Sequence, residues 1–395
     1  MQILFVNVVD CDNPVHTKYY PLAFGYLASY CYKHNESFEY TYTEQLNETV
    51  LKTIQPDVVA MTTITENYNL ARLYSHIIKR FNPHIKVILG GVHISAVPYS
   101  LSKDMDIGVI GEGEQTFLEL LRNDFEPNQK VKGIVYRKDD VFCKTEDRPL
   151  IKPLDLIPHP KRDMFGSEKR EQYIFTSRGC PYKCVFCFSS RFWKQVRFHS
   201  PEYVAEEIKQ IKRQFKISYL SIYDDTFVLD VERVNQIKDL IKDLKLTYSI
   251  NARANLITDK LARILKDMRV VTIGIGFESN SPKVLEYLHK GNTVEDNQKA
   301  VDILRKHKFF LYGSFIRDTP VESKEDLKLT YNFIRRNHIP YDMYRLMRYP
   351  GTPIYDECED WDSYKVYCYE SKIAKLRKFV AQIKPLKSLY GYLRK

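Results

Sequence analysis

Three closely spaced cysteines, Cys180, Cys184 and Cys187, are the residues of this chain best suited to chemistry. They stand in the stretch Thr176-Ser-Arg-Gly-Cys-Pro-Tyr-Lys-Cys-Val-Phe-Cys-Phe188, with the spacing C-x3-C-x2-C. Thiolates are the usual ligands of iron–sulfur clusters. Three of them can hold three irons of a [4Fe–4S] cube, which leaves the fourth iron open to bind and reduce a substrate.

A structural zinc site is the alternative that this spacing leaves open. Such a site takes four protein ligands, and the nearest candidate for the fourth is His199. No second C-x2-C pair follows the loop. The three-thiol loop therefore favours a cluster over zinc.

The cysteine loop resembles the cluster loop of the radical S-adenosylmethionine (radical SAM) superfamily. In that family the open iron binds the amino and carboxylate groups of S-adenosylmethionine, and reductive cleavage makes a 5′-deoxyadenosyl radical. Phe186 sits where the family carries an aromatic residue, which implies a place near the adenine. The resemblance implies a [4Fe–4S] cluster on the three cysteines and S-adenosylmethionine beside it.

Polar motifs follow successive predicted strands in the second half of the chain. They match later motifs of the cobalamin-dependent radical SAM group, namely D-D-x-F, A-R-A and G-x-E-S. The resemblance implies that S-adenosylmethionine lies near the polar residues of these motifs, which are Asp224, Asp225, Arg253, Glu278 and Ser279.

Further matches to the same group are individually weaker. They are a K-G pair at Lys290-Gly291, a fifth-strand pattern from Gly313 to Glu322 and a P-G-T-P turn at 350–353. The fifth-strand pattern departs from the group at Asp318, which replaces its second glycine. We therefore expect the backbone there to run slightly further from the adenine.

Four glycines in the first third of the chain stand where two predicted strands end: Gly90, Gly91, Gly111 and Gly113. Glycine lets the backbone approach a bulky ligand closely. The segments Leu89-Gly-Gly-Val-His93 and Gly111-Glu-Gly-Glu114 resemble the cobalamin-binding domain that precedes many radical SAM domains, which implies that the four glycines bind cobalamin.

One departure from other cobalamin-binding proteins concerns the cobalt ligand. Many of them carry D-x-H-x2-G after the first strand, and its histidine ligates cobalt, whereas Asp12 and His16 have the wrong spacing here. The radical SAM group commonly lacks that histidine. Cobalamin is therefore expected, without His16 as its ligand.

The elements that must position these residues alternate between strand and helix over residues 1–125. Such alternation predicts an α/β fold that begins with a doubly wound parallel sheet, of the cobalamin-binding Rossmann-like kind, with ligands at the carboxyl ends of its strands. The strands are expected at Ile3–Val9, Phe38–Thr43, Asp57–Thr63, Lys86–Gly91 and Ile107–Ile110, and the helices at Leu22–His34, Asn67–Phe81 and Thr116–Arg122.

Residues 126–170 are predicted to form a connector with a small hairpin, Val131–Arg137 and Val141–Lys144. Residues 171–355 alternate again, with helix N-caps expected at Ser200, Thr258, Thr293 and Ser323. Six βα units are too few for a closed eight-stranded barrel, so we expect a partial (β/α)6 radical SAM barrel with its site at the strand C-termini. The strands are expected at Tyr173–Thr176, Tyr219–Tyr223, Thr247–Asn251, Val270–Gly276, Phe309–Ile316 and Tyr344–Tyr349.

Composition and charge bound the class of protein. The chain is 44% hydrophobic and 28% charged, typical of a soluble globular protein, and has no run of eighteen apolar residues. The N-terminus lacks the features of a signal peptide, so the eight cysteines indicate a reducing cytoplasm. Much of the net charge of +10 lies in Lys372–Lys395, within a C-terminal tail of residues 356–395. That tail suits a solvated helix face, an anionic substrate or peripheral contact with a membrane.

These features predict a radical SAM enzyme that uses a [4Fe–4S] cluster to cleave S-adenosylmethionine reductively. Cobalamin-dependent methyl transfer to an unactivated carbon is the leading function, and cobalamin-associated radical cyclisation or rearrangement without net methylation is the alternative. The expected partners are a small-molecule or lipid substrate and an electron donor such as a flavodoxin or ferredoxin.

Two other classes fit less well. A non-catalytic cobalamin-binding module would need no open-iron cluster. A transfer-RNA thiomethylating enzyme would carry three further N-terminal cysteines, whereas only Cys11 and Cys31 lie there, and no RNA-binding module is recognised. Nucleic acid is therefore not an expected partner.

Overall fold

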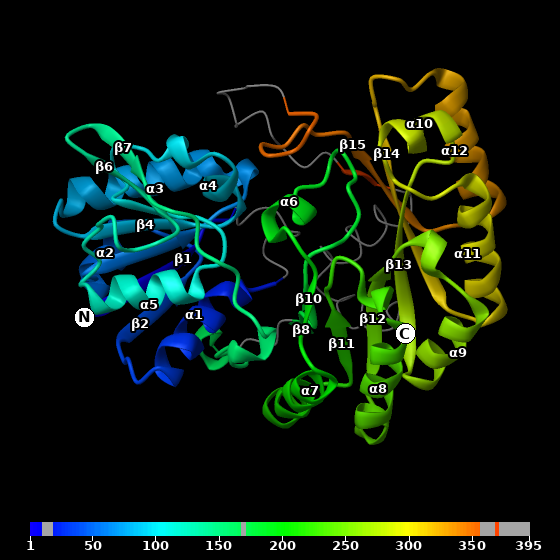
Figure 1. Ribbon diagram of the computed structural model, residues 1–395, viewed down its shortest axis with the longest axis horizontal. Helices are drawn as coiled ribbons and strands as arrows, with labels where there is room; N and C mark the ends of the chain where they lie inside the picture. Colours follow the sequence, from blue (N-terminus) through cyan, green and yellow to red (C-terminus); the bar gives the residue numbers. More distant parts are fainter. Residues whose placement is uncertain (10–18, 167–170, 356–367, 371–395) are drawn as a thin grey trace, which may run out of the picture. The chain divides into compact units, whose positions relative to one another are not determined.

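The computed structural model describes residues 1–9, 19–166, 171–355 and 368–370. The described residues form two compact units (Figure 1). Of the described residues, the first unit takes in 1–9, 19–166, 171–172, 188–215 and 349–355, and the second takes in 173–187, 216–348 and 368–370. Each unit contains a seven-stranded sheet, and the two are described separately below.

The sheet of the first unit has the strand order β2-β1-β3-β4-β5-β6-β7. Its first five members run parallel, and the hairpin β6–β7 adds two antiparallel strands to the edge at β5. The hairpin expected in the connector therefore extends this sheet. The strands are β1 (Gln2–Asn7), β2 (Glu39–Thr43), β3 (Val58–Thr62), β4 (Lys86–Gly90), β5 (Ile107–Val109), β6 (Ile134–Lys138) and β7 (Val141–Lys144).

Helices cover both faces of this sheet, as expected for a doubly wound fold. Figure 1 shows α1 (Leu22–Lys33) and α5 (Glu114–Arg122) on one face and α3 (Tyr68–Phe81) on the other. The interior of β1, Ile3–Val6, is apolar because both faces of the strand are covered. Phe5 packs its ring against Phe24 of α1 and Phe117 of α5. Leu4 and Val6 join the core beside α2 (Glu48–Ile54) and α3.

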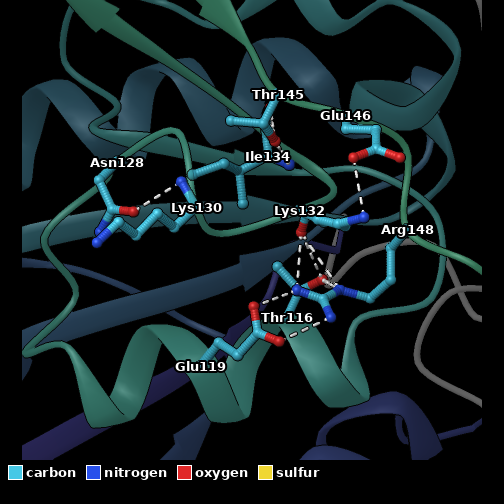
Figure 2. A network of polar contacts seen from close by, with 9 residues as sticks. All are labelled: Thr116, Glu119, Asn128, Lys130, Lys132, Ile134, Thr145, Glu146 and Arg148. Atoms are coloured by element: carbon cyan, nitrogen blue, oxygen red, sulfur yellow. Dashed lines mark hydrogen bonds and ion pairs between the residues drawn. The ribbon is translucent and has the colours of Figure 1, made fainter.

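Arg148 ties the β6–β7 hairpin to helix α5 (Figure 2). Its guanidinium makes a bidentate ion pair with Glu119 of α5, in which Nη1 lies 2.9 Å from Oε1. Its Nε also donates to the hydroxyl of Thr116 and the carbonyl of Lys132, at 2.8 and 3.3 Å. A bidentate arginine–carboxylate pair fixes orientation as well as distance. The helix after β5 is thereby held in register with the hairpin.

The sheet of the second unit contains six parallel strands, as expected for a partial barrel. The strand order is β8-β11-β12-β13-β14-β15, and antiparallel β16 pairs with β15. Within the described chain, β8 and β16 are the two edges and do not pair with each other. The strands are β8 (Tyr173–Ile174), β11 (Tyr219–Ile222), β12 (Thr247–Ala252), β13 (Val270–Glu278), β14 (Phe310–Arg317), β15 (Tyr341–Arg345) and β16 (Cys368–Glu370).

Helices alternate with these strands along the chain, and their expected N-caps are confirmed. Ser323 and Thr293 each form a capping box with the aspartate three residues later, and Thr258 accepts from the amide of Leu261. Ser200 accepts from the amide of Tyr203 at 3.1 Å. The helices are α8 (Val231–Ile241), α9 (Asp259–Asp267), α10 (Pro282–Tyr287), α11 (Val294–Lys306) and α12 (Lys324–Arg336), with α6 (Ser189–Trp193) and α7 (Pro201–Phe215) in the first unit.

Three expectations about elements were wrong. Strand β6 begins at Ile134 rather than at Val131. Strand β15 begins at Tyr341, three residues before the expected start at Tyr344, because its register follows its pairing with β14 rather than its mixed polar sequence. Helix α2 was not expected, although Asn47 caps it by accepting from the amide of Val50. In the described parts of the chain, no helix has the length and apolar character needed to cross a membrane.

Candidate active site

The three cysteines lie on the loop between β9 (Ser177–Arg178) and α6. None of the three is in a disulfide; Cys184 is buried, and Cys180 and Cys187 are half-buried. The amide of Cys187 donates to the carbonyl of Cys184 at 3.2 Å, and the amide of Val185 donates to the carbonyl of Leu288. Hydrogen bonds within the loop and to the end of α10 therefore fix its backbone.

Three cysteine thiols at this spacing are a suitable donor set for a [4Fe–4S] cluster. Among the described residues, no three His, Cys, Asp or Glu side chains already converge as a metal site, so the cluster assignment rests on spacing and donor chemistry. His199, the candidate fourth ligand of a zinc site, instead contacts Asp155 through Nδ1 at 2.9 Å and stacks on Tyr203. His16, Cys11 and Cys358 lie outside the described residues.

Asp224 anchors the chain just before the cysteine loop. Its Oδ1 accepts from the amides of Thr176 and Ser177 at 2.6 and 3.2 Å. Its Oδ2 accepts from the hydroxyls of the same two residues at 2.6 and 2.7 Å. Burial raises the pKa of Asp224, and these hydrogen bonds oppose that shift. The carboxylate is fully engaged in holding the start of the loop, while its role toward S-adenosylmethionine stays a prediction.

The next two residues differ in exposure. Asp225 is exposed, whereas Thr226 is buried and places its hydroxyl 3.8 Å from the sulfur of Cys180. Burial raises the pKa of Cys180, and the nearby hydroxyl of Thr226 counteracts it. The D-D-x-F segment therefore supports the loop through Asp224 and Thr226 and leaves Asp225 accessible to a ligand.

Arg253, directly after β12, links the cysteine loop to the Lys290-Gly291 pair that follows α10. The guanidinium lies over the ring of Tyr182, with 3.5 Å between its carbon and the ring centroid. Nη1 lies 3.6 Å from the sulfur of Cys184, and Nη2 donates to the carbonyl of Lys290. Arg253 is only 4% exposed, and its Nε has no partner in the structure. A buried donor without a partner indicates room for an acceptor that the protein does not supply.

Glu278 ends β13 in a left-handed conformation, with φ of +62°. Its carboxylate forms a buried ion pair with Lys290, at 2.9 Å between Oε1 and Nζ. Gly276 leaves space for this pair, since a Cβ there would lie 2.5 Å from the Glu278 carboxylate. Ser279 is fully buried, and its hydroxyl contacts Thr330 at 3.0 Å. These contacts orient the carboxylate and fix the backbone beyond it.

Phe186 and Asp318 are the remaining positions in the second half of the chain for which the sequence predicted a place near the adenine or a change in the backbone there. Phe186 is half-buried in the cysteine loop. Asp318, which replaces a glycine of the fifth-strand pattern, has φ of +62°. The backbone thus keeps a conformation that favours glycine, and aspartate is among the residues that tolerate it.

The glycines of the first unit lie at the carboxyl ends of β4 and β5, where ligands of such sheets bind. Gly91 has φ of +103°, and a Cβ there would lie 2.5 Å from the carbonyl oxygen of Thr63. Gly111 has φ of +76° and open space beside it, whereas a Cβ on Gly113 would touch Leu27. Gly90 closes β4 beside Met61. Gly91 therefore has no room for a side chain, whereas Gly90 and Gly111 have room for a Cβ. Contact of the four glycines with cobalamin stays a prediction.

A buried ion pair holds the turn between Gly111 and Gly113, and the sequence did not reveal it. Arg197, in β10 (Arg197–Phe198), meets both carboxylate oxygens of Glu112 at 2.8 and 2.9 Å. Glu112 also accepts from the amide of Ile151, whose carbonyl accepts from Arg197 at 2.7 Å. The only signal in the sequence was the position of Glu112 between two turn glycines.

His93 lies two residues after the glycine pair, in α4 (Val92–Ala96), and is completely buried. Its nitrogens contact the hydroxyls of Thr65 and Ser100, each at 3.2 Å, and its ring stacks on Tyr68 at 4.0 Å. Burial lowers the pKa of His93 to about 3. The imidazole is therefore neutral and fixes the backbone after β3 and β4.

Family models match both halves of the chain. The radical SAM superfamily model matches residues 174–334, and the B12 binding domain model matches residues 13–121. The chain also resembles structures of cobalamin-dependent enzymes at the level of the fold. TsrM from Kitasatospora setae gives a TM-score of 0.74 at 17% identity, covering 89% of this chain and 73% of TsrM. OxsB gives a TM-score of 0.72 at 21% identity, and the match covers 84% of this chain and 51% of OxsB.

Curated relatives include enzymes of two reaction types. The uncharacterised methyltransferase PH0819 of Pyrococcus horikoshii is 32% identical, over 78% of this chain and 70% of the relative. The anaerobic magnesium-protoporphyrin IX monomethyl ester cyclase of Rubrivivax gelatinosus is 28% identical, over 74% of this chain but only 56% of the relative. The bacteriochlorophyllide d C-8(2)-methyltransferase of Chlorobaculum tepidum is 27% identical, over 76% of this chain and 70% of the relative.

The matches confirm the expected family and cofactors. A radical SAM domain implies a [4Fe–4S] cluster and S-adenosylmethionine, and a B12 binding domain implies cobalamin. The chain belongs to the radical SAM superfamily, in the group whose members carry a B12 binding domain ahead of the radical SAM domain.

Proposed function

We propose that this protein is a cobalamin-dependent radical SAM methyltransferase that transfers a methyl group to an unactivated carbon. One observation carries the proposal: a three-cysteine loop without disulfides and a B12 binding domain occur in the same chain. Relatives named as methyltransferases support the reaction type, and one of them acts at a carbon of bacteriochlorophyllide d. The domain limits that we propose are 1–125, 126–170, 171–355 and 356–395.

The roles proposed for the residues follow from their contacts. Cys180, Cys184 and Cys187 would hold the cluster. Asp224 fixes the strand that leads into their loop. The residues proposed to bind S-adenosylmethionine are Phe186, Asp224, Asp225, Arg253, Glu278 and Ser279. When bound, the cluster supplies the electron for reductive cleavage and cobalamin carries the methyl group.

The first unit supplies a second ligand surface at the ends of β4 and β5. Gly90, Gly91, Gly111 and Gly113 are proposed to let cobalamin approach the backbone, because none of them projects a side chain there. The Glu112–Arg197 pair and the His93 network hold the two turns that carry these glycines. No histidine is proposed as the lower cobalt ligand.

Radical cyclisation or rearrangement without net methylation is the second candidate. The cyclase relative favours it, since that enzyme shares 28% identity with 74% of this chain. The two reactions differ in whether the product gains a methyl group. Incubation with S-adenosylmethionine carrying a deuterated methyl group, followed by mass spectrometry of the product, separates them. Label in the product supports methyl transfer, and an unlabelled cyclised product supports the alternative.

The first test of the proposed function needs no substrate. Anaerobically reconstituted protein, given S-adenosylmethionine and a reductant, should form 5′-deoxyadenosine. The variant with all three cysteines changed to Ala should not. Equal cleavage by that variant would contradict the cluster assignment and with it the proposed function.

The proposed partners are an electron donor such as a flavodoxin or ferredoxin and a small-molecule or lipid substrate. The lipid proposal rests on the basic composition of the tail, which lies outside the described residues apart from 368–370. In a cytoplasmic enzyme such a tail would contact the membrane peripherally, each basic residue contributing about 1 kcal/mol. Sedimentation with anionic vesicles tests this contact, using the full chain and a variant ending at Glu370. Equal binding of the two would contradict it.

A further inference from the structure

We infer that Arg253 is a positioning residue for the cluster itself: it donates a hydrogen bond to the sulfur of Cys184 and thereby raises the reduction potential of the cluster. The inference rests on the cluster site of the proposed function but is independent of methyl transfer. It adds to the expected contact of Arg253 with S-adenosylmethionine a role that operates before that molecule binds.

The geometry of Arg253 directs one N–H group at the thiol. Nη1 lies 3.6 Å from the sulfur of Cys184, within the range of a hydrogen bond to sulfur. Nη2 is engaged by the carbonyl of Lys290, and the guanidinium plane rests on the ring of Tyr182 at 3.5 Å. Two separate contacts therefore fix the orientation of the guanidinium, so the approach of Nη1 to Cys184 is not the chance position of a mobile side chain.

The charge of Arg253 points to an anionic partner that the protein does not provide. The side chain is 4% exposed, and in the described residues no carboxylate forms an ion pair with it. Its Nε–H is buried without an acceptor. A buried cation is stable only beside a compensating negative charge. A cluster held by three thiolates carries such a charge, and Cys184 is one of its proposed ligands.

A neighbouring cation and an N–H···S bond act in the same direction on the potential. Hydrogen bonds to the sulfurs and the net charge nearby are among the factors that set the potential of an iron–sulfur cluster. Reduction adds one negative charge, so a fixed positive charge stabilises the reduced cluster more than the oxidised one. Without Arg253 the cluster should accept an electron less readily, whether or not S-adenosylmethionine is present.

The test is a potentiometric titration of the cluster, followed by electron paramagnetic resonance, on the reconstituted full-length protein. At the wild-type midpoint potential, Arg253→Met should lower the ratio of reduced to oxidised cluster about tenfold, the effect of one charge-assisted hydrogen bond. That corresponds to a midpoint lower by about 59 mV. Arg253→Lys keeps the charge without the planar fork and should shift the midpoint less.

Variants of Tyr182 control for the orientation of the guanidinium. Tyr182→Phe keeps the ring face under Arg253 and should leave the midpoint unchanged, whereas Tyr182→Leu removes it and should shift the midpoint in the same direction as Arg253→Met. If Arg253→Met fails to take up iron, the midpoint potentials of Arg253→Lys and Tyr182→Leu are compared with that of wild type instead. Midpoints equal to that of wild type in both variants would overturn the inference.

The outcomes separate this inference from the proposed function. Equal midpoints for wild type and Arg253→Met without S-adenosylmethionine would overturn it, even if the wild-type enzyme transfers methyl groups. A difference that appears only after S-adenosylmethionine is added would also overturn it, because Arg253 would then act through that molecule alone. A wild-type protein that binds no cluster would overturn both.

Discussion

Replacing Glu112 by Gln should destabilise the first unit strongly. The change keeps the shape of the side chain but leaves the buried guanidinium of Arg197 without a counter-charge. Both side chains are almost inaccessible, and the pair makes two contacts of 2.8 and 2.9 Å. Removing one partner of such a pair costs about 3–5 kcal/mol. We therefore expect the free energy of unfolding to fall by that amount.

Urea denaturation followed by circular dichroism measures the effect, with a matched pair on the surface as control. Arg213 and Glu206 are also 2.8 Å apart, but both are exposed. Glu206→Gln should leave the urea midpoint unchanged, because solvent screens an exposed pair. The turn between Gly111 and Gly113 should also loosen in Glu112→Gln, which should weaken cobalamin binding in an equilibrium titration.

A double variant separates loss of the pair from loss of the buried charge. Changing Glu112 to Leu and Arg197 to Met removes both charges, so it should recover much of the stability that the single change loses. Wild-type stability of Glu112→Gln would refute the reasoning. A double variant as unstable as the single one would also refute it, since the cost would then lie in packing rather than in an unpaired charge.

Three further predictions concern the other parts of the site. Changing Cys180, Cys184 and Cys187 together to Ala should abolish iron binding, and full iron content in that variant would contradict the cluster assignment. Gly91→Ala should lower the free energy of unfolding by about 1–3 kcal/mol, because φ is +103° and the added Cβ would meet Thr63; an unchanged urea midpoint would argue against this. Burial lowers the pKa of His93 from 6.5 to about 3, so the unfolded chain binds more protons between these values. The free energy of unfolding should therefore decrease as the pH is lowered through that window, by up to about 1.4 kcal/mol per pH unit. In urea denaturations at pH 7 to pH 4, His93→Phe should make the free energy of unfolding depend less on pH. The same pH dependence of stability in His93→Phe and wild type would contradict this prediction.

The elements of the fold were predictable where the local sequence decides them. The interior of β1, Ile3–Val6, is apolar because both faces of a parallel sheet are covered, and this pattern is visible in the sequence. The cap residues Thr293 and Ser323 marked helix starts because their side chains act on amides three residues away. Strand β15 was placed too late because its pairing partner, and not its own composition, sets its limits.

The contacts that shape the site were not predictable, because they join residues far apart in the sequence. Arg253 could be identified from its motif, but its place over Tyr182 and beside Cys184 depends on how the cysteine loop meets the end of β12. Glu112 appeared only as part of a glycine turn, and its partner Arg197 follows 85 positions later. Ligands that are close in the sequence can be predicted from their spacing. Buried contacts between distant residues depend on tertiary packing and cannot be predicted in this way.

The optical spectrum of the protein purified and reconstituted without oxygen tests the assignment of function most directly. The protein is predicted to show the absorption of one [4Fe–4S] cluster together with that of cobalamin, with the cluster absorption lost in the triple cysteine variant and the cobalamin absorption kept. A spectrum of cluster without cobalamin, after incubation with excess cobalamin and gel filtration, would contradict the proposed cobalamin-dependent methyl transfer.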